Sequence, residues 1–145
     1  MPEEPPPLTT RLTGVLFFLG PWKPIPLKEL DRDGFGYKPA MSMEDLYKTV
    51  RGIWTLSPET ARNYTYAVGV FQRLTRGVWR IDHKSWQEVD IHTPTKRWAF
   101  RGHPITEGVV WEAFIGPRGH IVPETIPSGI RRVSGTGAAF GYWPN

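Results

Sequence analysis

Residues 64–82, YTYAVGVFQRLTRGVWRID, lie within the most regular region of the chain, which extends from Gly52 to Gly102. Two runs rich in β-branched and aromatic residues, 64–71 and 74–82, flank the pair Gln72-Arg73. Such runs are typical of β-strands, and a two-residue connection between them predicts a β-hairpin, although this turn contains no glycine.

The regions on either side of the hairpin predict further short strands. The apolar run 12–19 fits a buried strand. Other strands are expected at 53–56, 86–91 and 97–102. The final aromatic residues Phe140, Tyr142 and Trp143 suggest that the glycine-rich C-terminal part packs back on the body.

Helices are expected to be few and short. Ser42 fits the N-cap of a helix over 43–50, and Ser57 followed by Pro58 begins a brief helix through residue 62. The run 107–115 fits either a helix or a strand, because a short apolar run does not settle the period. The expected fold class is α+β, mostly β: a small curled sheet or partly open barrel with short helices at its ends.

Length and composition favour one globular domain. The chain has 145 residues, of which 39% are hydrophobic, and this is enough for a real core. Residues 1–9 are expected to be a flexible, proline-rich tail, and residues 10–145 a single β-rich domain. With no cysteine, the chain forms no disulfide and no cysteine-ligated zinc site. The acidic N-terminus does not resemble a secretory signal and the apolar stretch Gly14–Leu19 is too short to span a bilayer, so a cytoplasmic protein without membrane contact is expected.

The charge is unevenly spread along the chain. The net charge is +4, yet residues 46–145 carry thirteen basic and seven acidic side chains. Most of these basic residues are arginines, whose planar guanidinium suits phosphates and base edges. A basic domain favours polyanionic partners, of which nucleic acid is the main class, and both DNA and RNA are compatible with this pattern.

The alternation of strand residues predicts a surface rich in arginine. Trp79 and Ile81 should face the core, as should Trp98 and Phe100, because successive side chains point to opposite faces. The arginines expected to point outward from the two strands are Arg76, Arg80, Arg97 and Arg101, with Arg73 beside them at a strand end. If the strands are neighbours, these side chains would bind phosphates; the alternative is a solvated face paired with Glu88 or Asp90.

Trp54 is the tryptophan singled out as a ligand platform. It follows Arg51-Gly52, where the helix over 43–50 should lead into a strand. A tryptophan in that position can stack a base while Arg51 holds a phosphate, and the glycine lets a ligand approach the backbone.

The run RGIWTLSPETARNYTYAVGVFQRLTRGVWRIDHKSW at 51–86, with RWAFRG at 97–102, resembles a pattern in the PUA-like superfamily of small β-barrels, which includes ASCH, EVE and YTH-type domains. The resemblance extends over about residues 43–102, and more weakly to FIGPRG and FGYW near the end. It implies a partly open PUA-like barrel, with a pocket beside it that reads a modified or flipped base, in a defence, restriction or RNA-modification context. On this resemblance Trp54, and after it Trp98, match the position of the base-reading aromatic.

Other chemistry has weaker support in the sequence. Asp90 and His92 share one strand face and could serve a small metal- or histidine-dependent hydrolase, but the histidine spacing matches no compact ligand motif. Exposed aromatics near Trp111 and Trp143 would instead suit a protein partner or a homodimer. The sequence therefore predicts a nucleic-acid-binding module that needs no cofactor or metal, and favours a binding role over an enzymatic one.

Overall fold

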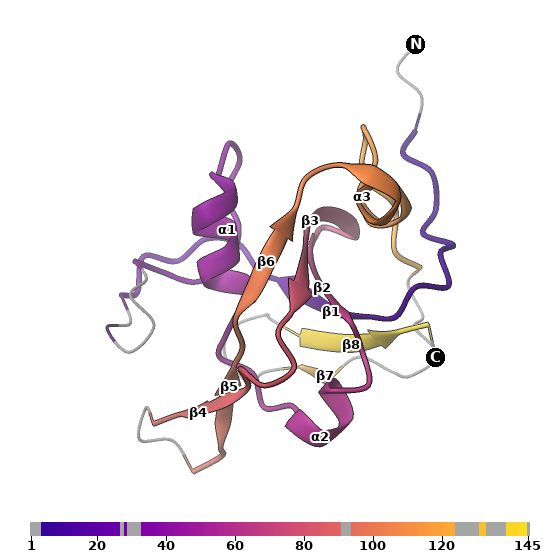
Figure 1. Ribbon diagram of the computed structural model, residues 1–145. Helices are drawn as coiled ribbons and strands as arrows, with labels where there is room; N and C mark the ends of the chain where they lie inside the picture. Colours follow the sequence, from indigo (N-terminus) through magenta and orange to yellow (C-terminus); the bar gives the residue numbers. More distant parts are fainter. Residues whose placement is uncertain are drawn as a thin grey trace.

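The computed structural model describes residues 4–26, 28, 33–90, 94–123, 131–132 and 139–144. The elements follow one another as β1 (Gly14–Leu19), α1 (Met43–Val50), α2 (Pro58–Ala61), β2 (Tyr66–Phe71), β3 (Leu74–Ile81), β4 (Gln87–Val89), β5 (Arg97–Ala99), β6 (Gly102–Ile105), α3 (Gly108–Phe114), β7 (Arg131–Arg132) and β8 (Ala139–Trp143). Figure 1 shows the strands at the centre, with α1 and α3 on either side of them. No helix among these residues is long and apolar enough to cross a membrane.

The main sheet is mixed and has the strand order β6-β3-β2-β1-β8-β7, in which β7 is a two-residue edge strand. Strand β1 runs parallel to β2 and antiparallel to β8, and the other neighbours are antiparallel. Strands β4 and β5 form a separate two-stranded sheet. The predicted α+β class with mostly strands is confirmed, and within the described part of the chain the main sheet remains open, with β6 and β7 at its edges.

The β2–β3 hairpin predicted from residues 64–82 is confirmed. Gln72 and Arg73 form its turn with positive φ angles of 52° and 65°. These angles match a type I′ turn, whose twist suits a hairpin and which usually contains asparagine or glycine. The long pairing of the two strands therefore stabilises a turn that its own residues favour little.

The sheet is covered on both faces. The core on the α1 side, here core 1, includes Phe17, Trp79 and Phe100, whereas the core on the α3 side, here core 2, includes Val78 and Phe114. The expectation that one face of β3 points outward and carries arginines is therefore wrong for the middle of the strand. Val78, which that expectation placed outward beside Arg76 and Arg80, is fully buried because α3 packs over it.

Helix α1 begins and packs as its sequence dictates. The Ser42 side chain accepts a hydrogen bond from the Asp45 backbone N–H, which confirms the predicted N-cap. The helix lies close to the sheet because Gly69 and Gly77 have no side chains: a Cβ on Gly69 would lie 2.8 Å from a Val50 methyl group. The glycines within this hairpin thus let a helix approach its surface.

Other elements differ from the sequence expectations in extent. The expected strand at 53–56 is reduced to one bridge between Trp54 and Trp98, and the expected strand at 97–102 divides into β5 and the start of β6. The ambiguous run 107–115 forms helix α3. The predicted return of the C-terminal aromatics is confirmed, since β8 lies beside β1 and the rings of Tyr142 and Tyr64 stack at 4.5 Å.

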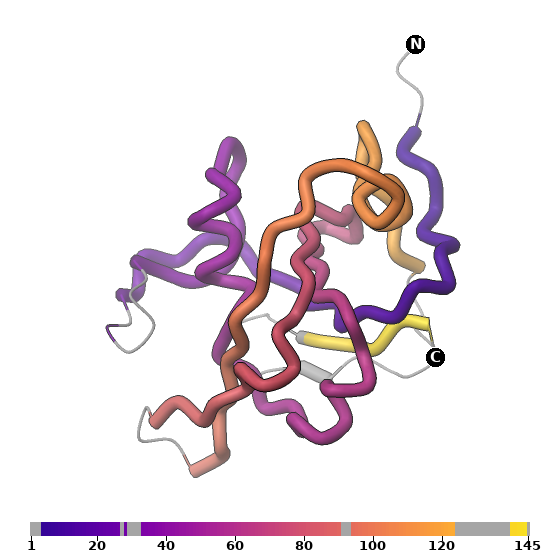
Figure 2. The backbone as a smooth tube through the Cα atoms, viewed as in Figure 1, coloured from indigo at the N-terminus to yellow at the C-terminus, as the bar shows by residue number. Residues whose placement is uncertain are grey.

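The N-terminal segment does not extend as a free tail over its whole length. The backbone of residues 6–8 pairs with Ile121, and the side chain of Leu8 is only 2% exposed. In Figure 2 this indigo segment runs beside the orange segment that follows α3. Proline is well suited to such an extended segment, and burial of Leu8 in core 2 holds it in place.

Candidate nucleic-acid interface

Two of the predicted arginines meet where β3 pairs with the edge strand β6. Arg80 lies directly opposite His103, and the next pair of the ladder joins the Asp82 N–H to the Arg101 carbonyl at 2.9 Å. Because side chains alternate along both strands, Arg80, Arg101 and His103 belong to one face of the sheet. All three residues are exposed, and they are called the basic cluster below.

An aromatic side chain of β2 extends the basic cluster toward the centre of the sheet. Tyr66 of β2 lies opposite Arg80 on the other side of β3, so its ring shares the face of the basic cluster. Tyr66 is half-buried, and its ring lies 5.7 Å from that of Phe114 in α3. The face therefore carries an aromatic ring beside arginine side chains, and α3 packs along one side of that ring.

The outer edge of β6 is closed to further strand pairing. The Gly102 N–H, which points away from β3, donates to the Tyr47 hydroxyl at 3.0 Å. The next outward position is Pro104, which has no N–H. Arg51 lies along the same segment: its Nε donates to the Phe100 carbonyl at 3.0 Å. Arg51 therefore lies beside the segment that leads into the basic cluster, with its guanidinium partly engaged by backbone and 5.9 Å from the Tyr47 ring on the core 1 side.

Arg73 and Arg76 do not join the basic cluster. Strand β3 carries one extra residue at Arg76, because Gly69 pairs with Gly77 whereas Val70 pairs with Thr75. This bulge turns Arg76 toward Tyr37, with its guanidinium 5.0 Å from that ring, and away from the face of Arg80. Arg73 lies in the hairpin turn, roughly 20 Å along the strand from Arg80. The prediction that Arg76 and Arg80 share a face is therefore wrong.

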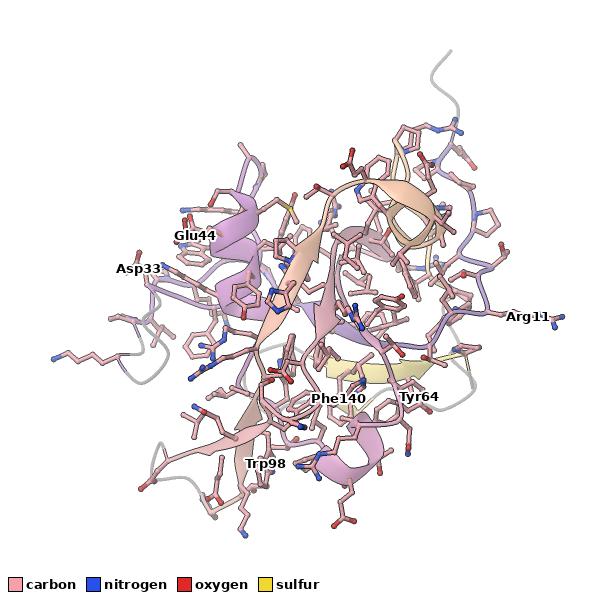
Figure 3. The ribbon with its side chains drawn as sticks, viewed as in Figure 1. Arg11, Asp33, Glu44, Tyr64, Trp98 and Phe140 are labelled. Carbon is pink, nitrogen blue, oxygen red and sulfur yellow. The ribbon has the colours of Figure 1, made fainter. Side chains whose placement is uncertain are left out.

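Arg97 and Trp98 belong to the β4–β5 sheet, a separate lobe at the lower end of the molecule in Figure 3. Arg97 is half-buried, and its Nε is buried without a hydrogen-bond partner among the described residues. Trp98 packs against core 1. The four arginines expected in one patch are consequently divided between two sheets.

The structure corrects the expectation for Trp54. Its ring lies in core 1 with 3% of its surface exposed, 4.6 Å from the ring of Phe17. Its Nε1 donates to the Val50 carbonyl at 2.7 Å. A base stacks only on an accessible ring face, so Trp54 is a core residue and not the stacking platform predicted from its position after α1.

Sequence reasoning missed His103 and Tyr66 as members of this face. His103 lies next to a proline, which weakens any strand pattern. No local signal identifies the pair, because they meet only through the register of β2, β3 and β6.

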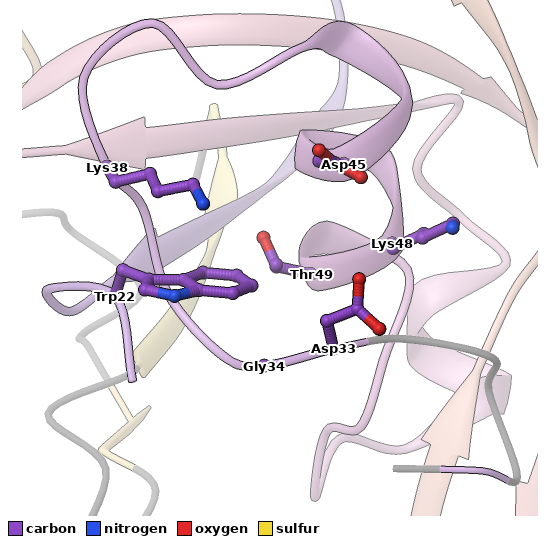
Figure 4. A pocket seen from close by; sticks show the side chains of 7 residues that line it. All are labelled: Trp22, Asp33, Gly34, Lys38, Asp45, Lys48 and Thr49. Carbon is purple, nitrogen blue, oxygen red and sulfur yellow. The ribbon is translucent and has the colours of Figure 1, made fainter. Parts of the chain in front are cut away.

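A second candidate binding site is a small pocket between α1 and the segments 20–23 and 34–38 (Figure 4). Its volume is about 90 Å³, and Lys38 lies over the Trp22 ring at 4.7 Å. In Figure 4 the Thr49 hydroxyl and the Lys38 ammonium point into the space above that ring. Ligand pockets usually measure about 300–1,000 Å³, so this one is too small for a nucleoside.

The structure adds little support for the alternative sites predicted from the sequence. No group of three or more histidine and carboxylate side chains gathers among the described residues. His92, the partner expected for Asp90, lies outside those residues. Trp111 and Trp143 are half-buried against core 2, and the Trp143 Nε1 donates to the Thr10 carbonyl.

Comparison of the chain with protein-family models, curated proteins and solved structures finds no match. The resemblance to PUA-like domains therefore stays a prediction based on the sequence pattern. The candidate interface accordingly rests on the geometry of its own side chains.

Proposed function

We propose that this protein is a nucleic-acid-binding module that contacts the phosphate backbone through the basic cluster of Arg80, Arg101 and His103. The observation that supports the proposal most is the exposure of these three side chains on one face of two paired strands. Arginine pairs bidentately with phosphate, and histidine donates hydrogen bonds to it. Arg51, at the neighbouring edge, would extend the contact.

The charged side chains along the β3–β6 ladder favour an anionic ligand. Asp82 is the carboxylate nearest along the ladder, and one of its oxygens accepts the Lys84 backbone N–H at 3.1 Å. This bond directs the carboxylate into its own turn. Along the β3–β6 ladder on this face, two arginines and a histidine then outnumber one carboxylate, in keeping with the positive charge of the whole chain.

The narrower form of the proposal is a PUA-like curled sheet that reads a modified or flipped base. A flipped base needs an enclosing pocket with stacking side chains. The pocket beside α1 is too small for a base and lies on the side of α1, away from the basic cluster. The proposal therefore centres on backbone contacts, and base reading is its less supported extension.

A protein-interaction module is the second candidate, but the geometry favours it less. Strand addition at β6 would lack donors, because Gly102 is bonded to Tyr47 and Pro104 has no N–H. The aromatics expected to form a partner surface, Trp111 and Trp143, are half-buried within this chain.

The test is a salt titration of oligonucleotide binding, with mixed-sequence DNA and RNA as probes. Each phosphate contact contributes about one unit to the slope of log affinity against log salt for a duplex. The double variant Arg80→Ala with Arg101→Ala should lower affinity and reduce that slope by about two. Arg62→Ala is the matched control, because Arg62 is exposed at the end of α2, outside the cluster. No binding at low salt, or equal loss in the control, would overturn the proposal.

A further inference from the structure

We infer that the ligand of this face is a single-stranded segment of nucleic acid, with one base stacked on Tyr66 and its neighbouring phosphates on Arg80 and Arg101. This inference rests on the proposed function and specifies its substrate class. It is carried by a different observation: the half-buried aromatic ring in register with Arg80 on the same face.

Tyr66, Arg80 and His103 form a row across the sheet. The spacing of this row suits one unpaired nucleotide and its flanking phosphates. Tyr66, Arg80 and His103 lie on three adjacent strands, so the row spans about 10 Å across the sheet. Side chains directly opposite each other have Cβ atoms about 5 Å apart, and arginine reaches beyond that. A base on the Tyr66 ring would therefore hold its own phosphate within reach of Arg80.

The aromatic ring contributes only if the base is unpaired. In a duplex each base is stacked between its neighbours, and its faces are closed to a protein ring. A single strand offers every base as a free π-face, which is why sheet surfaces with an aromatic residue and flanking cations bind single strands. Tyr66 has the matching position here, since Phe114 supports its ring on one side.

The surroundings of the row also limit what can approach. Helix α3 stands on the same face as Tyr66, with Phe114 and Trp111 packed into core 2. Glu107 and Glu112, both exposed, add negative charge at and along that helix. A broad duplex would meet this helix, whereas a single strand can cross β2, β3 and β6 along the row.

The experiment compares single strands with a duplex. Labelled oligothymidylate and oligouridylate serve as single-stranded probes, and a DNA hairpin of equal length serves as the duplex. Tyr66→Leu, which keeps an apolar contact to core 2, should weaken single-strand binding by about 5- to 100-fold. The same variant should leave hairpin binding unchanged, and Tyr66→Phe should retain single-strand affinity because it keeps the ring.

The outcomes separate this inference from the proposed function. Binding of the hairpin as tight as that of the single strands, with no effect of Tyr66→Leu, would overturn the inference and leave the proposed function standing. Absence of binding to every probe would overturn both. If Tyr66→Leu fails to fold, ultraviolet crosslinking of the wild-type protein to a 5-bromouridine oligonucleotide decides the matter: crosslinks should fall in the peptide containing Tyr66, and their absence there would contradict the inference.

Discussion

Arg80 of β3 and His103 of β6 lie directly opposite each other at the edge of the six-stranded sheet, and both side chains are exposed. The two residues are far apart in the sequence, and the β4–β5 lobe lies between them in the chain. Their pairing turns scattered basic residues into a compact site. The backbone hydrogen bonds of the sheet hold the site in place, so its side chains extend from a rigid backbone.

A negative charge introduced at position 103 should weaken nucleic-acid binding without unfolding the protein. His103→Glu would pair with Arg80 and repel phosphate, so we expect a three- to tenfold loss of affinity, or about 0.6–1.4 kcal/mol. His103→Gln keeps a hydrogen-bond donor and should lose less. Both residues would be exposed, and stability should change by less than about 0.5 kcal/mol in urea denaturation. Tighter binding by His103→Glu would contradict a phosphate contact at this position.

Replacement of Trp54 should affect folding. Trp54→Ala removes a ring buried between Phe17 and α1, and the free energy of unfolding should fall by about 3–5 kcal/mol. Trp54→Phe keeps much of the packing but loses the bond to the Val50 carbonyl, at a cost of about 1–3 kcal/mol. Urea denaturation measures both. If Trp54→Phe left stability unchanged and abolished oligonucleotide binding, Trp54 would be a ligand contact after all.

The close approach of α1 to the hairpin predicts a measurable coupling between Gly69 and Val50. Gly69→Ala places a Cβ 2.8 Å from the Val50 methyl group and should cost about 1–3 kcal/mol. Val50→Ala removes that methyl group, so the double variant should lose at least about 0.5 kcal/mol less than the sum of the single variants. A strictly additive double-mutant cycle would show that the helix shifts freely and that the contact does not constrain it.

Docking of the N-terminal segment should contribute to stability. Leu8→Ala leaves a cavity in core 2 and should lower the free energy of unfolding by about 2–5 kcal/mol. Its neighbour Thr9 is exposed, and Thr9→Ala should change stability by less than about 0.5 kcal/mol. Equal effects of the two substitutions in thermal or urea denaturation would mean that residues 6–8 do not pack as described.

The parts of the fold that the sequence predicted are those determined by neighbouring residues. Alternating apolar residues indicated β2 and β3, and Ser42 and Ser57 marked the starts of α1 and α2 because a cap acts within one helical turn. Strand β6 went unrecognised as a separate strand, since it is short and contains Pro104. It forms because β3 offers it a register and because Tyr47 binds its outer edge.

The candidate site was predicted only in part, and the errors have a common cause. Strict alternation placed Arg76 with Arg80, but one extra residue in β3 turned Arg76 to the other face. Trp54 was predicted to be accessible because it follows Arg51-Gly52, after the end of α1, whereas the bridge to Trp98 places it in core 1. Bulges and long-range bridges arise from tertiary packing, and a single sequence has no local signal for them.

Backbone amide shifts during an oligonucleotide titration show directly whether nucleic acid binds at the basic cluster and Tyr66. A two-dimensional NMR titration of the isotope-labelled protein with a short single-stranded oligonucleotide reports each contacted residue separately. We expect saturable shifts centred on Tyr66, Arg80 and residues 101–103, with small changes at Arg73 and Arg76. Shifts concentrated at the hairpin turn or at the pocket beside α1, or no shifts at low salt, would contradict binding at this face.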